Sequence, residues 1–151
     1  MTVAVQTATI RLATHGDVPR LCELLEALKR ETFWGSLQVE LDGGFMSQHL
    51  HETLVFHPQR RVLVLEEDGV IRGVGYGEIV THPLIPHWPH LIEWALYVEQ
   101  PFRGRGLGAR LWSELKAWAR RQGAKGAVYG KTLSVGPHKK REVMIWESFD
   151  A

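Results

Sequence analysis

The sequence has few of the residues that disulfides, zinc sites and membrane spans require. Its 151 residues include one cysteine, Cys22, which excludes an internal disulfide and a zinc site built from several cysteines. The longest purely hydrophobic run, Trp94 to Val98, is far shorter than the ~20 residues that a membrane-spanning helix needs. Lys and Arg number 18 against 17 Asp and Glu, so no overall positive field exists to attract nucleic acid or membrane. Any anion site must therefore be local.

Export features are also missing from the start of the chain. The first ten residues hold no Lys or Arg and no apolar block of the kind found in secretory signals, so we expect a cytoplasmic protein. The composition, 44% hydrophobic and 23% charged, is that of an ordinary folded protein. The length predicts a single domain over residues 1–151.

Changes in hydrophobic period predict strands and helices in the order β-α-α-β-β-β-α-β-β, which indicates a mixed α/β (α+β) domain. Asp68-Gly69 predicts a tight antiparallel hairpin. The expected strands are 8–13, 61–66, 70–80, 91–98, 126–133 and 142–149, and the expected helices are 19–31, 45–54 and a third that begins near 107 and ends at Gln122-Gly123.

Glycine and proline add two local expectations. Gly73, Gly75 and Gly77 alternate along one expected strand, so one face of it carries almost no side chains and a helix should pack closely there. The segment from His82 to His90 contains three prolines, which predicts an ordered loop around Trp88.

The segment from Leu91 to Leu111 is the most informative in the chain. It has no acidic residue after Glu99 and is rich in glycine just before a helix begins, and Arg103 and Arg105 add positive charge. Free backbone N–H groups at a helix start, with glycines that let a ligand approach, form a cradle for a phosphate.

Three other interpretations of this glycine-rich segment compete with a phosphate cradle. Gly104, Gly106 and Ala109 fit a dinucleotide fingerprint, but that motif needs an acidic residue about 20 positions later, and the stretch 116–141 has none. A P-loop ending at Gly130-Lys131-Thr132 would need glycine where Lys125 stands. A plain helix start is the remaining alternative, and three alternate glycines argue against it.

The run Arg103-Gly104-Arg105-Gly106-Leu107-Gly108 resembles the [QR]-x-x-G-x-[GA] acetyl-CoA signature of the GNAT superfamily of N-acetyltransferases. The preceding Leu96-Tyr97-Val98 resembles the Leu-x-Val element that ends the strand before this signature, and the likeness spans about Ile10 to Leu133. It implies a central mixed, largely antiparallel sheet flanked by helices. It also implies that amides from Arg103 to Gly108 hold the pyrophosphate of acetyl-CoA, while Leu96, Tyr97 and Val98 lie along the pantetheine and acetyl group.

The resemblance implies direct transfer of an acetyl group from acetyl-CoA to a primary amine on a small molecule or peptide. Many members carry an Asn and a later Tyr in a C-terminal helix, and that tyrosine protonates the leaving thiolate. This chain has no asparagine, and residues 136–141 do not align with that helix. Tyr129 is the candidate proton donor by position, against the alternative of an ordinary strand tyrosine.

Glu93 is the candidate general base, because it lies five residues before Val98 in the strand that brings the thioester to the acceptor. The alternative is a solvent-facing strand carboxylate. Trp34 and Trp88 are the candidate substrate contacts. Trp34 lies near Glu31, Glu40 and Asp42, and carboxylates with aromatic rings suit a cationic amine, although an ordinary polar loop fits the same residues.

Six of the eight histidines fall into two groups, His82, His87 and His90 in one segment and His49, His51 and His57 in another. Neither group has a neighbouring cysteine or an H-E-x-x-H pairing, so we expect no metal site. The family often dimerises, so the resemblance also allows a homodimer. The main rival function is a non-catalytic acyl-CoA-binding module that has lost the acid. An NAD-dependent oxidoreductase is a distant third.

Overall fold

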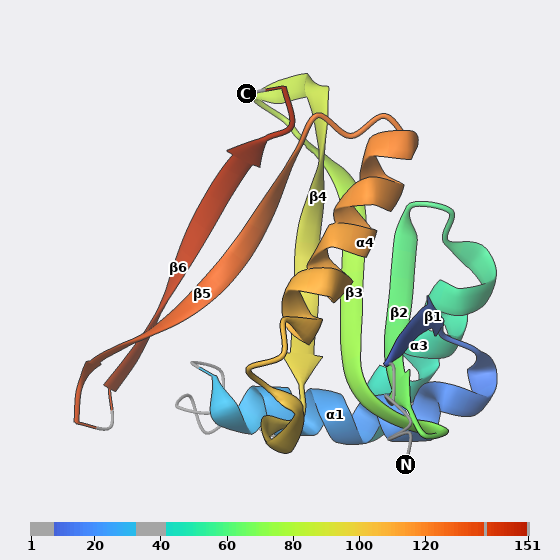
Figure 1. The fold of residues 1–151 in the computed structure, drawn as a ribbon. Coiled ribbons are helices and arrows are strands. Elements are labelled where there is room, and N and C mark those ends of the chain that lie inside the picture. The colour runs from blue at the N-terminus through green and yellow to red at the C-terminus, as the bar shows by residue number, and fades with distance from the viewer. Residues whose placement is uncertain (1–7, 33–41, 138, 151) are drawn as a thin grey trace, which may run out of the picture.

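The computed structural model describes residues 8–32, 42–137 and 139–150, which form a six-stranded sheet with helices on both faces (Figure 1). The strands lie in chain order across the sheet, and every pair of neighbours is antiparallel except β4 and β5. This confirms the expected mixed, largely antiparallel α+β class. The strands are β1 (Thr9–Leu12), β2 (Arg60–Glu67), β3 (Val70–His82), β4 (Ile85–Val98), β5 (Gly126–Gly136) and β6 (Lys139–Ser148). The helices are α1 (Val18–Glu31), α3 (Gly43–Phe56) and α4 (Leu107–Arg121), with 3-10 turns η1 (His15–Asp17) and η2 (Gln100–Phe102).

Two hydrophobic clusters hold the helices to the sheet. On one face Leu111 and Leu115 of α4 pack with Leu65 of β2, and all three are completely buried. On the other face Leu21 of α1 and Leu50 of α3 pack against the buried strand side chains that point to that face. None of the helices in the described ranges has the length and apolar content needed to cross a membrane.

The alternate glycines of β3 allow the close packing that their spacing predicts. A Cβ atom at Gly75 would lie 3.2 Å from Cδ1 of Leu115 in α4. A Cβ atom at Gly73 would lie 2.9 Å from the carbonyl oxygen of Tyr97 in the neighbouring strand. The predicted hairpin is also confirmed, because Asp68 and Gly69 join β2 to β3 with φ values of 54° and 74°, the left-handed pair that a tight hairpin turn requires.

The prediction of an irregular loop from His82 to His90 is wrong. β4 begins at Ile85, and only a two-residue turn separates it from β3. The register explains why prolines are tolerated: Val80 pairs with His90 while His82 pairs with Ile85, so β4 has three more residues than β3 in this interval. In such a bulged stretch a residue need not donate a ladder hydrogen bond, and proline fits there.

β4 and β5 separate soon after they meet. They pair in parallel over three residues only, from His90–Gly126 to Ile92–Val128, and the long arm formed by β5 and β6 then swings away from the rest of the sheet (Figure 1). Beyond the pairing, β4 has a bulge, because Gly77 pairs with Glu93 and Tyr76 with Ala95, which leaves Trp94 without a partner on β3. The split and the bulge occur at the same place in β4.

Candidate active site

The glycine-rich run lies at the start of α4 and lines a cavity of about 310 Å³, which we call the glycine-loop cavity. Gly104 and Gly106 have φ values of 82° and 74°, and a Cβ atom at either would have no neighbour within 4 Å, so the backbone faces open space. The first intrahelical bond runs from the N–H of Arg110 to the carbonyl of Gly106. The three preceding N–H groups, at 107–109, have no partner within the helix and are available to an anion. The full lining is Leu96, Tyr97, Val98, Phe102, Arg103, Gly104, Gly106, Leu107 and Gly108.

The two arginines of this run are already engaged by carboxylates. Nη2 of Arg103 donates to Oε2 of Glu31 at 2.6 Å, and its Nε donates to the carbonyl of Val98 at 2.7 Å. Nη1 of Arg105 donates to both oxygens of Glu67, at 2.8 and 3.2 Å. The sequence predicts that these arginines reinforce the positive charge of the loop. In the structure both guanidinium groups are paired with carboxylates, whereas the N–H groups at 107–109 have no partner within the helix.

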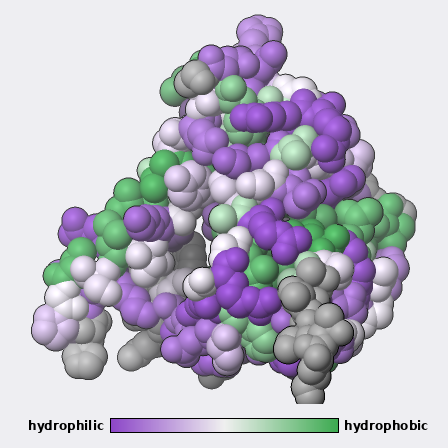
Figure 2. Space-filling model, viewed as in Figure 1, coloured by the Kyte–Doolittle hydropathy of each residue, from purple (hydrophilic) through white to green (hydrophobic). Residues whose placement is uncertain are grey.

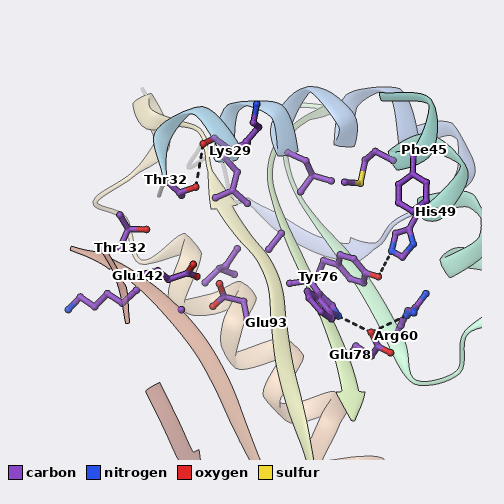
Figure 3. A pocket seen from close by; sticks show the side chains of 18 residues that line it. Lys29, Thr32, Phe45, His49, Arg60, Tyr76, Glu78, Glu93, Thr132 and Glu142 are labelled. Atoms are coloured by element: carbon purple, nitrogen blue, oxygen red, sulfur yellow. Dashed lines mark hydrogen bonds and ion pairs between the residues drawn. The ribbon is translucent and has the colours of Figure 1, made fainter. Parts of the chain in front are cut away.

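A second cavity, of about 940 Å³, opens between α1, α3, the strands β2 to β4 and the β5–β6 arm (Figure 3). We call it the central cavity. Leu96 lines both cavities, so the two adjoin at this residue of β4. The apolar lining of the central cavity includes Leu25, Leu28, Phe45, Met46, Ala95 and Leu96. The polar or charged lining of the same cavity includes Lys29, Thr32, His49, Arg60, Tyr76, Glu78, Glu93, Lys131, Thr132 and Glu142.

Glu93 faces into the central cavity from the bulged part of β4 (Figure 3). Its carboxylate has no hydrogen bond or ion pair with a side chain in the described part of the chain. Burial, and then the negative charge of Glu142, raise the pKa of Glu93 to about 7. A carboxyl group with this pKa can take and release a proton near neutral pH, which is what a general base requires.

The sequence did not identify a polar pair and a group of three polar side chains at the other side of the central cavity. The hydroxyl of Tyr76 and Nε2 of His49 share a hydrogen bond of 2.8 Å, and burial lowers the pKa of His49 and raises that of Tyr76. Nε1 of Trp94 donates to Oε2 of Glu78 at 2.8 Å, and the same oxygen lies 3.2 Å from Nε of Arg60. No motif marks these residues, because they come from α3 and three separate strands.

Other residues singled out from the sequence lie elsewhere. Trp88 packs against His90 and Trp146, with ring centroids 5.3 and 6.3 Å away, and lines neither cavity. Tyr129 packs edge-on against Trp112 of α4 with centroids 5.5 Å apart and lines neither cavity either. Trp34 and Glu40 lie outside the described residues.

The remaining acidic and metal-ligand candidates have structural surroundings. Asp42 caps α3, where its Oδ1 accepts from the N–H of Phe45 at 3.0 Å. Burial raises the pKa of the Cys22 thiol, which keeps it neutral and unreactive. Within the described ranges, no group of three or more His, Cys, Asp or Glu residues has a metal-binding arrangement.

The glycine-rich start of α4 and the central cavity thus adjoin at Leu96, and Glu93 faces the central cavity where β4 and β5 diverge. Residues 21–134 match the acetyltransferase (GNAT) family. The chain is also 30% identical over 124 residues to L-methionine sulfoximine/L-methionine sulfone acetyltransferase of Salmonella typhimurium, an alignment that covers 81% of this chain and 69% of that protein. The chain belongs to the GNAT family, as its signature predicts, and is an N-acetyltransferase that uses acetyl-CoA.

Solved structures agree on the fold. A putative acetyltransferase of Salmonella typhimurium, solved with its cofactor acetyl-CoA, has a TM-score of 0.70 at 20% identity, with 96% of this chain and 95% of that chain covered. A ribosomal-protein-alanine N-acetyltransferase of Brucella melitensis also has a TM-score of 0.70 at 20% identity, with 93% and 99% covered. Nothing in these comparisons supports the non-catalytic alternative.

The glycine loop yields a prediction about coenzyme A binding. Gly108→Val should weaken binding by at least about tenfold, because the new side chain points to where a ligand must approach the backbone. Within the protein, a Cβ atom at Gly108 meets only Cγ2 of Val98, at 3.9 Å, so the fold should tolerate the change. Arg103→Ala should weaken coenzyme A binding less than about fivefold, because it removes only one charge contact to coenzyme A, and solvent screens that contact. Titration calorimetry with coenzyme A, alongside the melting temperature of each free protein, measures both effects. Normal binding by a folded Gly108→Val protein would place the cradle elsewhere.

Proposed function

We propose that this N-acetyltransferase acts on a small primary amine whose apolar body fills the central cavity and whose ammonium group reaches Glu93. The main support is the cavity itself: its volume of about 940 Å³ suits a small molecule, and Leu25, Leu28 and Phe45 contribute to its apolar lining. The Salmonella relative acts on L-methionine sulfoximine and L-methionine sulfone, which are small amino-acid derivatives.

We propose that the glycine-loop cavity receives the pyrophosphate of acetyl-CoA, with the N–H groups of 107–109 as donors. Leu96 and Val98 then lie along the pantetheine, beside the edge of β4 that β5 leaves. In the described structure β4 pairs with β5 no further than Ile92, so β5 leaves the later backbone groups on that edge of β4 unpaired. The carbonyl of Val98, the last residue of β4, accepts from Nε of Arg103. Acetyl-CoA supplies the thioester whose acetyl group is transferred.

Glu93 acts as the general base in this proposal. Its carboxylate accepts a proton from the ammonium group, which frees the lone pair on nitrogen. The neutral nitrogen forms a bond to the acetyl carbon while the C–S bond breaks. The second proton that nitrogen loses neutralises the departing thiolate, so one amide, one thiol and one released proton result. The cysteine takes no part, because its thiol stays protonated.

Glu93→Gln should lower kcat by about 10²–10⁴-fold and leave coenzyme A affinity unchanged, because it removes only the proton acceptor. In the wild-type enzyme kcat/KM should rise with pH through about 7, as Glu93 ionises, and this limb should be absent from the variant. Tyr129→Phe is the companion variant. A large loss of kcat in Tyr129→Phe would identify the Tyr129 hydroxyl as the proton donor to the thiolate. A kcat within a few-fold of wild type would exclude this role. A Glu93→Gln enzyme with nearly full kcat and the same pH limb would remove Glu93 as base.

An acceptor screen tests the substrate proposal. Release of free thiol from acetyl-CoA is followed with L-methionine sulfone, L-methionine sulfoximine, spermidine, an aminoglycoside and a peptide with a free N-terminus. We expect the highest kcat/KM with a small amine that has an apolar or weakly polar body. Turnover confined to the peptide would show that the acceptor is a polypeptide.

We also propose a cytoplasmic homodimer. The single cysteine supports the location, because proteins of oxidising compartments commonly carry paired cysteines. In the described part of the chain β6 pairs only with β5, so its outer edge is open to another strand, and apolar residues lie along the arm (Figure 2). Antiparallel pairing of β6 with a second copy about Met144 would place Arg141 opposite Glu147 at two symmetric positions, where Glu147 is also paired with Lys116 of its own chain at 3.1 Å.

Met144→Asp tests the dimer by placing two carboxylates opposite each other at the two-fold axis. Met144 is 53% exposed, so the monomer should keep its fold. We expect a dimer for the wild-type protein and a monomer for the variant by sedimentation velocity. Leu133→Asp, on β5 and away from the open edge, is the control and should remain dimeric. A wild-type protein that sediments as a monomer at all concentrations would contradict the proposal.

A further inference from the structure

β6 brings a second carboxylate into the central cavity, opposite Glu93. Glu142 lines this cavity, and the two carboxylates approach each other from the arm and from β4 (Figure 3). The space that Glu142 occupies lies over Gly130 of the adjacent strand, and a Cβ atom at Gly130 would collide with its Oε1. A glycine at this position therefore lets the carboxylate fold back over β5 into the cavity.

The charges around the pair leave it without a fixed counterion. Within the described ranges, neither Glu93 nor Glu142 has a hydrogen bond or ion pair with another side chain, whereas Arg60 is paired with Glu78 at 3.2 Å. The other titratable groups that face the cavity are Lys29 on α1, His49 on α3, Tyr76 on β3 and Lys131 on β5. The acceptor end of the cavity thus has two neighbouring negative groups, and a cation is the ligand that would compensate both.

We propose that Glu142 is a specificity and positioning residue: it selects acceptors that arrive as ammonium cations, and the bound cation holds Glu93 ionised. This rests on the proposed role of Glu93 as the base. Burial, and then repulsion by the nearby Glu142, favour the protonated form of Glu93 near neutral pH in the empty site. A cation between them reverses this preference, and binding of the correct substrate then generates the ionised base. A neutral molecule of the same shape lacks this effect.

The test measures the ionisation of Glu93 directly and does not depend on the natural acceptor. Carboxyl ¹³C NMR titration of the full-length enzyme should give a pKa near 7 for Glu93 in the wild type. Glu142→Gln should lower this pKa by about one unit, because the neighbouring charge is gone. Glu114→Gln, which removes an exposed carboxylate of α4, is the matched control and should change nothing.

Two ligands of similar shape then separate charge from fit. 2-Phenylethylammonium should lower the pKa of Glu93 in the wild type, and 2-phenylethanol should not. Glu142→Gln should bind the cation about tenfold more weakly, and the alcohol equally well. Gly130→Ala, which keeps the charge but displaces the Glu142 carboxylate, should weaken cation binding while leaving coenzyme A affinity intact.

Two results would overturn the inference. The first is a Glu142→Gln protein that binds the cation as wild type does with the Glu93 titration unchanged. The second is equal binding of the cation and the alcohol by the wild type. Both leave Glu93 as base untouched, since its own test is the loss of kcat in Glu93→Gln. A failure of that test with a normal Glu142 result would instead refute the proposed mechanism.

Discussion

The short parallel pairing of β4 and β5 is the constraint on which the rest of the structure depends. Three residue pairs join these strands, and α4, which connects them, is fixed to the sheet by buried leucines. Because the strands diverge after Ile92, the last part of β4 has one edge that β5 does not pair. That one stretch faces the central cavity at Glu93, adjoins both cavities at Leu96 and leads into the glycine loop. In the proposed mechanism a fully paired sheet would leave no room for a thioester between Glu93 and the glycine loop.

The charged side chains of the glycine loop have partners of opposite charge, whereas two carboxylates of the central cavity, Glu93 and Glu142, do not within the described residues. The arginines of the glycine loop are paired with Glu31 and Glu67, so in the proposed mechanism the pyrophosphate is held by backbone N–H groups and not by long cationic side chains. In the same proposal the acceptor is oriented by its charge, because only its ammonium group gains from the carboxylate end.

Features that are set by neighbouring residues in the chain could be predicted from the sequence. The turn at Asp68-Gly69, the bare glycine face and the helix start at Leu107 follow from local backbone chemistry, and all are confirmed. Features that depend on strand register could not. The prolines around Trp88 fit into β4 at a bulge, and Glu142 reaches the cavity because it pairs with Thr132 and extends over Gly130. Neither register is encoded in a short motif.

The most direct test of the central claim is a crystal structure of the enzyme with a ketone analogue of acetyl-CoA in which CH₂ replaces the thioester sulfur. The account predicts pyrophosphate oxygens at roughly 2.7–3.2 Å from the N–H groups of 107–109. It also predicts that the acetyl carbonyl lies in the split between β4 and β5, facing the cavity that contains Glu93. An analogue bound outside that split, or with its acetyl group on a face of the sheet remote from Glu93, would contradict it.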